Sequence, residues 1–384
     1  MIHLILREPI AYQKTLYRVL SENYEGAVTA WFDEPAVLDR SFDPRLDRLR
    51  FLSQTGYRQL WRELRQDREP VVILGSWSSE IAYKTLFIVL ILRVPVFIWA
   101  DHPHPVKRRL AKDLARKLYL RVLSRLVAGF LACGRPTARQ LAALGIDPRK
   151  ITVFPYWVEV PARWSLPNAA LAPQSVVFRL VAIGRHVAVK QFELAIKAVG
   201  LANAKEPQRS IELILVGDGP ERSLLERAAG SYGSREAVNF RGWLNRDDLF
   251  REITSADALV LTSKFDAYGV VVLEAMAHGR PVFASDGVVA ALDRDDRSGA
   301  IILHPAGDAD SLAKQIAMLA SDHDRLRRAS FAARSISEKW RPERAVSILD
   351  GLLNDCSGPW AQRKKRTAPA REVLTSDTTF IARQ

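Results

Sequence analysis

The 384-residue chain has few cysteines and no long uninterrupted apolar run, and each shortage excludes a class of protein. Its two cysteines, Cys133 and Cys356, lie far apart, and neither has a companion at the spacing of metal ligands. A disulfide framework and a zinc site are therefore not expected. The most apolar segment, residues 86–100, is interrupted by Arg93 and Pro95, so it is too short and too broken to span a bilayer. We interpret it as a buried helix followed by a buried strand.

The beginning of the chain also lacks the pattern of a secretory signal. MIHLILREPI has neither a charged n-region nor a long apolar core. The scarcity of cysteine also argues against a secreted protein, because disulfides form in oxidising compartments. We therefore expect a soluble protein of the reducing cytoplasm.

Positive charge is what the sequence has in excess. Lysine and arginine number 56 against 43 acidic residues, which gives a formal net charge of +13 and an isoelectric point near 9.9. Such a balance favours negatively charged partners, whether nucleic acid, anionic lipid or nucleotide substrates. The sequence contains no zinc finger, RNA-binding aromatic signature or basic zipper, so we do not expect a nucleic-acid partner.

The length predicts two or more domains, and the 48% hydrophobic content provides material for their cores. Strand-like apolar runs alternate with segments of helical spacing in two series, which predicts parallel sheets with helices on both faces. We expect a Rossmann-like α/β domain over 1–160, a proline-rich linker over 161–175 and a second such domain over 176–356, facing one another across a cleft. The basic tail, 357–384, has no hydrophobic period and is expected to be disordered.

The expected elements can be given by residue number. Helical spacing predicts helices near 10–22, 79–92, 107–125 and 135–144. The predicted strands are 2–6, 27–32, 71–74, 94–99, 126–132 and 151–154 in the first series, and 176–184, 211–217, 237–241, 258–262, 281–285 and 300–303 in the second.

The most informative stretch is SKFDAYGVVVLEAMAHGRPVF, residues 263–283. Asp266 lies in a loop between a strand and a helix that begins near Val270, and Gly269 permits a tight turn. Free N–H groups at such a helix start can bind phosphate. Asp266 is placed to accept hydrogen bonds from sugar hydroxyls, and Glu274, one turn into the helix, suits the two hydroxyls of a ribose. The alternative is that Asp266 is a helix-terminus charge and Glu274 a solvated surface acid.

Two further strand ends carry residues suited to a phosphate ligand. Arg185 and Lys190 follow a strand that ends at Gly184, with Lys190 opening the next helix. A guanidinium and an ammonium fixed there are suited to a diphosphate, although a lone arginine and lysine are usually solvated surface cations. Gly217, in VGDGP, marks another strand end, in ordinary strand-to-helix turn chemistry.

In this order and spacing, four motifs resemble the second domain of retaining, family-four glycosyltransferases of GT-B fold. They are GR-x4-K, VGDGP, VNFRGWL and S-x-x-D-x-Y-G-x-x-x-x-E-A-M-A-x-G-x-P-V, within roughly residues 178–340. Before residue 155 the likeness is limited to the α/β pattern and to LACGRPTARQLAALGIDPRKITVFPYWVE.

The resemblance implies transfer of a sugar from a nucleotide-sugar with retention at the anomeric carbon, without a metal or another cofactor. Arg185 and Lys190 would bind the diphosphate and Asp266 would orient the donor sugar. The other expected contacts are Glu274 to the ribose, the N–H groups of Val270 and Val271 to phosphate or sugar, and Trp243 and Leu244 near the base, with packing an equal role for Trp243. His102, in WADHPHP, would face the reacting sugar, with a structural turn as the equal alternative.

The sequence departs from the family pattern at three places. Asp266 stands where the first acid is usually Glu, which keeps the carboxylate on a shorter stem. Gln191 replaces the usual Gly after the lysine, so the entry into the helix is expected to differ. REPIAYQKTLY, residues 7–17, occupies the place of the usual glycine-rich loop after the first strand.

Residues 106–128 form a basic amphipathic pattern. Leu110, Leu114, Leu118 and Val122 make an i, i+4 stripe, and eight cations fill much of the remainder: Lys107, Arg108, Arg109, Lys112, Arg116, Lys117, Arg121 and Arg125. Such a helix can lie on an anionic membrane. Alternatively, the stripe packs on the sheet and the cations are solvated.

Together these features predict a cytoplasmic, membrane-associated hexosyltransferase of cell-surface polysaccharide or glycolipid assembly. Its donor would be a UDP- or GDP-sugar and its acceptor a glycan or a lipid-linked sugar. The alternatives are a GT-B sugar-nucleotide epimerase, for which the extra cleft acids and histidines are missing, and a basic membrane- or nucleic-acid-binding protein on a catalytically degenerate fold.

Overall fold

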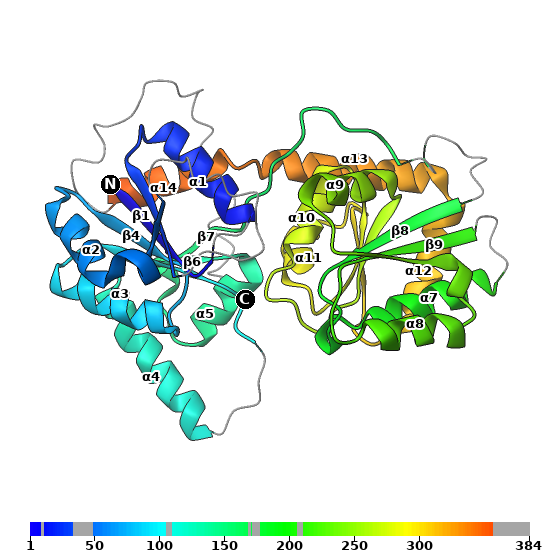
Figure 1. Cartoon of the computed structure of the whole chain (residues 1–384), viewed down its shortest axis with the longest axis horizontal. Coiled ribbons are helices and arrows are strands. Elements are labelled where there is room, and N and C mark those ends of the chain that lie inside the picture. Colours follow the sequence, from blue (N-terminus) through cyan, green and yellow to red (C-terminus); the bar gives the residue numbers. More distant parts are fainter. Residues whose placement is uncertain are drawn as a thin grey trace. The chain divides into compact units, whose positions relative to one another are not determined.

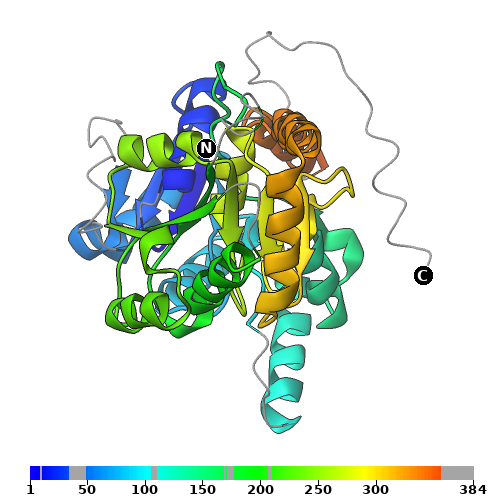
Figure 2. The same cartoon turned by 90° about the vertical axis from the view of Figure 1, so that its right-hand side faces the viewer.

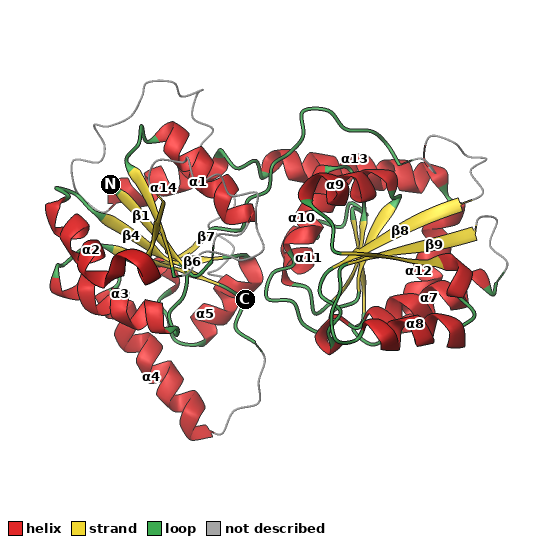
Figure 3. Cartoon of the chain, in the orientation of Figure 1, coloured by secondary structure: helices red, strands yellow, loops and turns green. Residues whose placement is uncertain are grey.

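The computed structural model describes residues 1–8, 11–33, 49–104, 110–167, 170, 177–205 and 210–355. The chain divides into two compact units, one of residues 1–101, 105–155 and 343–384 and the other of residues 102–104 and 156–342. Each unit contains one parallel sheet with helices on both faces, as the alternating pattern predicts (Figures 1 and 3). The boundaries differ from the expected ones mainly at the C-terminal end, where residues 343–355 join the first unit instead of the second.

The sheet of the first unit has the strand order β3-β2-β1-β4-β5-β6-β7. Its central strands are buried, apolar runs, which is the pattern of a parallel sheet covered on both faces. The strands are β1 (Ile2–Leu6), β2 (Val28–Phe32), β3 (Leu49–Phe51), β4 (Val71–Leu74), β5 (Val96–Ala100), β6 (Gly129–Ala132) and β7 (Ile151–Val153). The sequence prediction missed only β3, which at three residues is too short to show a period.

Helices α1 and α14 pack against each other in the first unit. The Tyr24 hydroxyl, just after α1, donates a hydrogen bond of 2.9 Å to the carboxylate of Asp350 on α14. This contact attaches the last described helix to the first unit. The helices of this unit are α1 (Ala11–Asn23), α2 (Leu52–Gln66), α3 (Glu80–Ile91), α4 (Leu110–Leu126), α5 (Arg135–Ala143) and α14 (Arg344–Asp355), with the 3-10 turn η1 (Pro148–Lys150).

One expectation and one alternative about helices in this unit are wrong. Helix α3 is not buried all round, because Phe87 and Ile91 are exposed. The α4 stripe does not pack on the sheet either; Leu118 is exposed, and Leu120 and Leu123 face the core in its place. Both helices carry more than one apolar row, so sequence spacing alone did not show which row faces inward. Lys107, Arg108 and Arg109 lie outside the described residues, and among the described ones no helix has the length and hydropathy needed to span a membrane.

The sheet of the second unit has the order β10-β9-β8-β11-β12-β13, with every pair parallel, so its strand ends lie along one edge. The strands are β8 (Val177–Ile183), β9 (Ser210–Val216), β10 (Val238–Gly242), β11 (Ala258–Leu261), β12 (Val282–Ser285) and β13 (Ile301–His304). The helices are α7 (Phe192–Asn203), α8 (Arg222–Ser231), α9 (Arg246–Ser255), α10 (Val270–Ala277), α11 (Val289–Arg294), α12 (Ala309–Ser321) and α13 (His323–Lys339), with the 3-10 turns η2 (Ala188–Lys190) and η3 (Arg235–Ala237).

The described part of the expected linker is attached to the second unit. The buried Arg280 guanidinium donates to the Ser165 carbonyl at 2.8 Å, and the Arg334 guanidinium donates to the Pro161 carbonyl at 2.5 Å. Trp164 packs edge-on against Phe331. Residues 168–169 and 171–176, Cys356 and the tail 357–384 lie outside the described residues.

Candidate active site

The expected site residues of the second unit follow four neighbouring strands. Arg185 follows β8, Gly217 follows β9, Trp243 follows β10 and Asp266 follows β11. These strands are adjacent in the order β10-β9-β8-β11, and all are parallel, so the four positions lie along one edge of the sheet. In open α/β sheets this carboxyl edge is where ligands bind.

Gly217 allows the turns after β8 and β9 to come into contact. Its φ is +120°, and a Cβ there would lie 2.1 Å from the carbonyl oxygen of Gly184. The turns are tied by two backbone bonds of His186, whose N–H donates to the Asp218 carbonyl and whose carbonyl accepts from Glu221. Arg185 lies on this turn with an exposed side chain, so its guanidinium is available to a ligand.

His186 is a residue that the sequence analysis did not select. Its ring is fully buried, edge-on to Phe192 and Phe240 at 5.5 and 6.4 Å between centroids. Burial lowers the pKa of this histidine, which keeps the ring neutral. It therefore supports the turn that presents Arg185, and nothing in the sequence pattern distinguishes it from a surface histidine.

Lys190 and Asp266 form an ion pair at the centre of this edge. Lys190 Nζ lies 2.5 Å from Asp266 Oδ2, and the two side chains are 21% and 15% exposed. The Asp266 carboxylate therefore balances part of the Lys190 charge, and the other ammonium hydrogens can still donate to a ligand. The pair holds both side chains in one place, with part of each open to a ligand.

The entry into α7 differs from the expected one. Lys190 does not open the helix but ends the 3-10 turn η2, and α7 begins at Phe192. Between them Gln191 adopts the left-handed conformation, with φ +49° and ψ +40°, which glycine adopts at little cost. Thr262, directly after β11, donates its hydroxyl hydrogen toward the carbonyl oxygens of Lys190 and Gln191, at 3.0 and 2.9 Å. Thr262 was also missed by the sequence analysis.

Gly269 directly precedes α10, in a conformation that few other residues tolerate. Its φ is +89°, and a Cβ there would lie 2.8 Å from Val288 Cγ1. Val270 and Val271 are the first two residues of the helix and are half-buried. Their N–H groups precede the first turn and have no acceptor within the helix, so they can donate to an anion.

Glu274 is half-buried on α10, so the interpretation of it as a solvated acid is wrong. Burial raises the pKa of its carboxyl, and the positive charge of Arg246 opposes that rise. The Arg246 guanidinium lies over the ring of Phe250, 5.0 Å from its centroid. Arg246 was not selected from the sequence, where it is one of many cations.

The loop after β10 presents Trp243 to solvent, with 66% of the residue exposed, while Leu244 is half-buried. That exposure disagrees with a packing role for Trp243. The loop ends at Asn245, whose side chain accepts from the Asp248 N–H and caps α9.

His102 lies against the residue that precedes Asp266. Residues 102–104 belong to the second unit, and the rings of His102 and His104 lie 6.1 and 4.4 Å from that of Phe265. Burial lowers the pKa of His102, which favours the neutral ring. These contacts place His102 within reach of the Asp266 loop.

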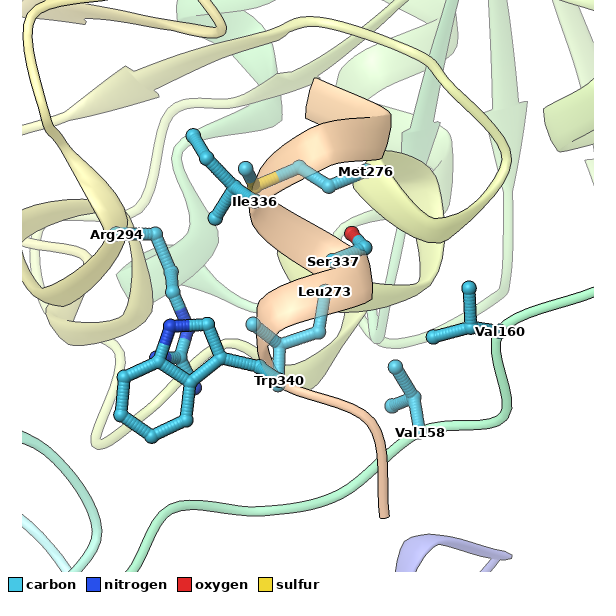
Figure 4. Close-up of a pocket in the computed structure, with 8 residues that line it drawn as sticks. All are labelled: Val158, Val160, Leu273, Met276, Arg294, Ile336, Ser337 and Trp340. Atoms are coloured by element: carbon cyan, nitrogen blue, oxygen red, sulfur yellow. The ribbon is translucent and has the colours of Figure 1, made fainter. Parts of the chain in front are cut away.

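A small apolar pocket lies elsewhere in the unit, beside α10 and α13 (Figure 4). The guanidinium of Arg294 stacks on the ring of Trp340, 3.8 Å from its centroid. None of the expected site residues lines this pocket, whose walls are Val158, Val160, Leu273, Met276, Arg294, Ile336, Ser337 and Trp340. We therefore do not assign it to the candidate site.

The described residues contain no group of three or more His, Cys, Asp or Glu side chains that could hold a metal ion.

Comparison with known proteins shows which family and which relatives this chain is similar to. Residues 177–322 match the family model of glycosyl transferases group 1. The chain is 30% identical over 248 residues to a D-inositol 3-phosphate glycosyltransferase of Nocardia farcinica, which covers 61% of this chain and 52% of that protein. It is 34% identical over 118 residues to a lipopolysaccharide core biosynthesis glycosyltransferase of Rhizobium meliloti, which covers 31% and 32%. The chain thus spans about half or less of the curated relatives.

The solved structures show the same fold along most of the chain. Anabaena HepE in complex with UDP aligns with a TM-score of 0.74 at 16% identity, over 93% of this chain and 100% of that one. WaaG, described as a glycosyltransferase involved in lipopolysaccharide biosynthesis, aligns with a TM-score of 0.61 at 17% identity, over 91% and 100%.

Two parallel sheets with helices on both faces, and the likeness to these solved structures, assign the chain to the GT-B class of fold. Residues 177–322 are thus similar to the glycosyl transferases group 1 family, and the curated relatives are glycosyltransferases.

Proposed function

We propose that the protein is a retaining glycosyltransferase that transfers a hexosyl group from a UDP- or GDP-sugar to a glycan or lipid-linked acceptor in cell-surface glycan assembly. The observation that carries the proposal is the edge of the second sheet. Arg185, the Lys190–Asp266 pair and the start of α10 after Gly269 follow neighbouring strands there. The matched family and the relatives support glycosyltransferase activity.

The diphosphate of the donor would lie against the positive groups of this edge. Arg185 would give forked hydrogen bonds, Lys190 a point charge, and the N–H groups of Val270 and Val271 further donors. Glu274, once ionised, would accept hydrogen bonds from both ribose hydroxyls. Gly217 permits the close approach of the two turns, and Trp243 and Leu244 would lie near the base.

These positive groups would stabilise the charge that grows on the leaving diphosphate as the glycosidic bond breaks. The acceptor hydroxyl would attack from the face that the diphosphate leaves, and its proton would pass to a leaving phosphate oxygen. Asp266, fixed by Lys190, would orient the donor sugar, and the neutral ring of His102 would face the reacting carbon. Because Arg185 and Lys190 supply the positive charge, the proposed reaction needs no metal ion or other cofactor.

The first unit would recognise the acceptor. A cytoplasmic location and peripheral contact with the inner face of the plasma membrane through residues 106–128 are part of the proposal. The excess of cations supports it, because the cytoplasmic leaflet is negatively charged.

The test is to incubate the full chain with a panel of UDP- and GDP-sugars and to measure the slow release of nucleoside diphosphate. We expect release from one donor, and loss of that release in Lys190→Ala. A protein that hydrolyses no donor and binds neither UDP nor GDP would refute the proposal. If this inactive protein still floats with vesicles, or retards nucleic acid in a gel in a salt-dependent way, it would fit the alternative of a basic binding protein on a catalytically degenerate fold. Conversion of the donor into a stereoisomer would identify an epimerase.

A further inference from the structure

Helix α3 carries an apolar row on its outer face. Tyr83, Phe87 and Ile91, spaced four residues apart, are 53%, 66% and 52% exposed. Its inner face is also apolar and packs in the core of the first unit through Ile81, Leu86 and other side chains. The side chains of the outer row therefore take no part in the core of the unit. Large exposed apolar patches of this kind mark sites of interaction.

Helix α4 carries a second such row. Leu114, Leu118, Val122 and Leu126, again spaced by four, are 69%, 62%, 47% and 53% exposed. Figures 1 and 2 both show α4 extending beyond the rest of the first unit. The row is thus presented on a projecting helix.

The two helices are neighbours. The Tyr119 hydroxyl on α4 donates a hydrogen bond of 2.9 Å to the carbonyl oxygen of Trp77, three residues before the start of α3. Tyr83 on α3 is also close enough to act electrostatically on Tyr119. We call the seven exposed side chains of the two rows, with the cations described next, the α3–α4 surface.

Cations line the apolar row of α4. Lys117, Arg121 and Arg125 are exposed and again spaced by four, so they form a parallel row on the same helix. The one acid among the described residues of this helix, Asp113, is half-buried and lies 3.6 Å from the Lys117 ammonium. An apolar row bordered by a cationic row is the pattern of a helix that lies in the interface of an anionic bilayer.

We propose that the α3–α4 surface docks the protein on an anionic membrane, with both apolar rows in the headgroup region and the cationic row against lipid phosphates. Charge complementarity selects this occupant, because the chain carries a net +13 and the row presents three cations together. A symmetric pair of chains joined through this surface would bring two cationic rows close to each other. The inference specifies the membrane contact of the proposed function, adds helix α3 to it, and does not depend on the reaction.

The test is flotation of the full chain with phosphatidylcholine vesicles that contain or lack phosphatidylglycerol. We expect binding to the anionic vesicles only. Neutralising three cations in Lys117→Gln/Arg121→Gln/Arg125→Gln should weaken the partition coefficient by roughly a hundredfold, because each cation near the surface contributes a factor of about five. Phe87→Gln/Ile91→Gln and Leu114→Gln/Leu118→Gln should each weaken it as well.

The matched control is Arg325→Gln/Arg327→Gln/Arg328→Gln on α13, which removes the same charge from exposed positions in the second unit. This control should float like the wild type. All substituted side chains are exposed, so release of nucleoside diphosphate in solution should stay unchanged and report intact folding. That readout also separates failure of the docking surface from failure of the proposed activity.

Three results would overturn the inference. The first is wild-type protein that does not float with anionic vesicles. The second is flotation that the α3 and α4 variants retain or that the α13 control loses equally. The third is a dimer in light scattering that Leu114→Gln/Leu118→Gln converts to a monomer, since a second copy would then cover the surface.

Discussion

Removal of the Lys190 ammonium is the most informative perturbation of the candidate site. In Lys190→Ala the carboxylate of Asp266 loses a partner 2.5 Å away and stays only 15% exposed. Exposed pairs contribute about 0–1 kcal/mol, whereas breaking a fully buried pair costs about 3–5 kcal/mol. The Lys190–Asp266 pair lies between these limits, so we expect the free energy of unfolding to fall by about 2 kcal/mol.

The same substitution removes a cation from the proposed diphosphate site. Loss of one such donor typically costs about 2.7–4 kcal/mol of transition-state stabilisation, so kcat/KM should fall roughly 100- to 1000-fold. Urea unfolding and release of nucleoside diphosphate measure the two effects separately. Asp266→Asn and the double variant complete a cycle, in which we expect the stability coupling to be about 1–2 kcal/mol.

Lys205→Ala is the matched control, because Lys205 is an exposed lysine just past the end of α7. It should change neither quantity. The reasoning is refuted if Lys190→Ala unfolds and turns over like the Lys205→Ala control, or if the cycle shows no coupling with Asp266.

Three more predictions concern single residues. Gln191→Gly should raise the free energy of unfolding by roughly 1 kcal/mol. The reason is that Gln191 has φ +49° and that its buried Oε1 has no hydrogen-bond partner among the described residues. A lower free energy of unfolding, measured with urea, would contradict this. Gly217→Ala should destabilise the protein by more than about 2 kcal/mol, because its Cβ would lie 2.1 Å from the Gly184 carbonyl oxygen. The control Gly230→Ala, on α8, places a Cβ with no atom within 4 Å and should be neutral or stabilising. Equal melting temperatures of the two variants would contradict the turn geometry. Glu274→Gln should raise the melting temperature and weaken UDP or GDP binding in calorimetry. The pKa of Glu274 is raised in the folded state, so its contribution to stability falls as pH rises through that pKa, while nucleotide binding strengthens; an opposite pH trend of binding would argue against the ribose contact.

The fold could be predicted from the sequence because buried parallel strands appear in it as continuous apolar runs. β1 and β5 are such runs, and so are the strands of the second sheet around β8 and β11. β3 was missed since three residues show no period. Helix α14 was placed in the wrong unit because spacing along the chain does not reveal which unit a terminal helix packs against.

The candidate site was predictable where turn chemistry restricts the residue type. Gly217 and Gly269 have positive φ and crowded surroundings, so glycine in the sequence reports the geometry directly. Partners were not predictable. The ion pair of Lys190 with Asp266 joins residues 76 positions apart, and the charge of Arg246 reaches Glu274 from another helix. Such contacts depend on the order of strands in the sheet, which a single sequence does not state.

The exposed rows of α3 and α4 show a further limit of sequence analysis. An apolar residue such as Phe87 or Leu118 fits a core-facing helix position as well as an outward-facing one, and only the three-dimensional packing distinguishes them.

The central claim is that the carboxyl edge of the second sheet binds a pyrophosphate. The most direct measurement is a crystal structure of the full chain soaked with UDP or with GDP. The account predicts phosphate oxygens within hydrogen-bonding distance of Arg185, Lys190 and the N–H groups at the start of α10, and the ribose hydroxyls on Glu274. A nucleotide bound at any other edge or surface of the molecule, with these groups untouched, would contradict it.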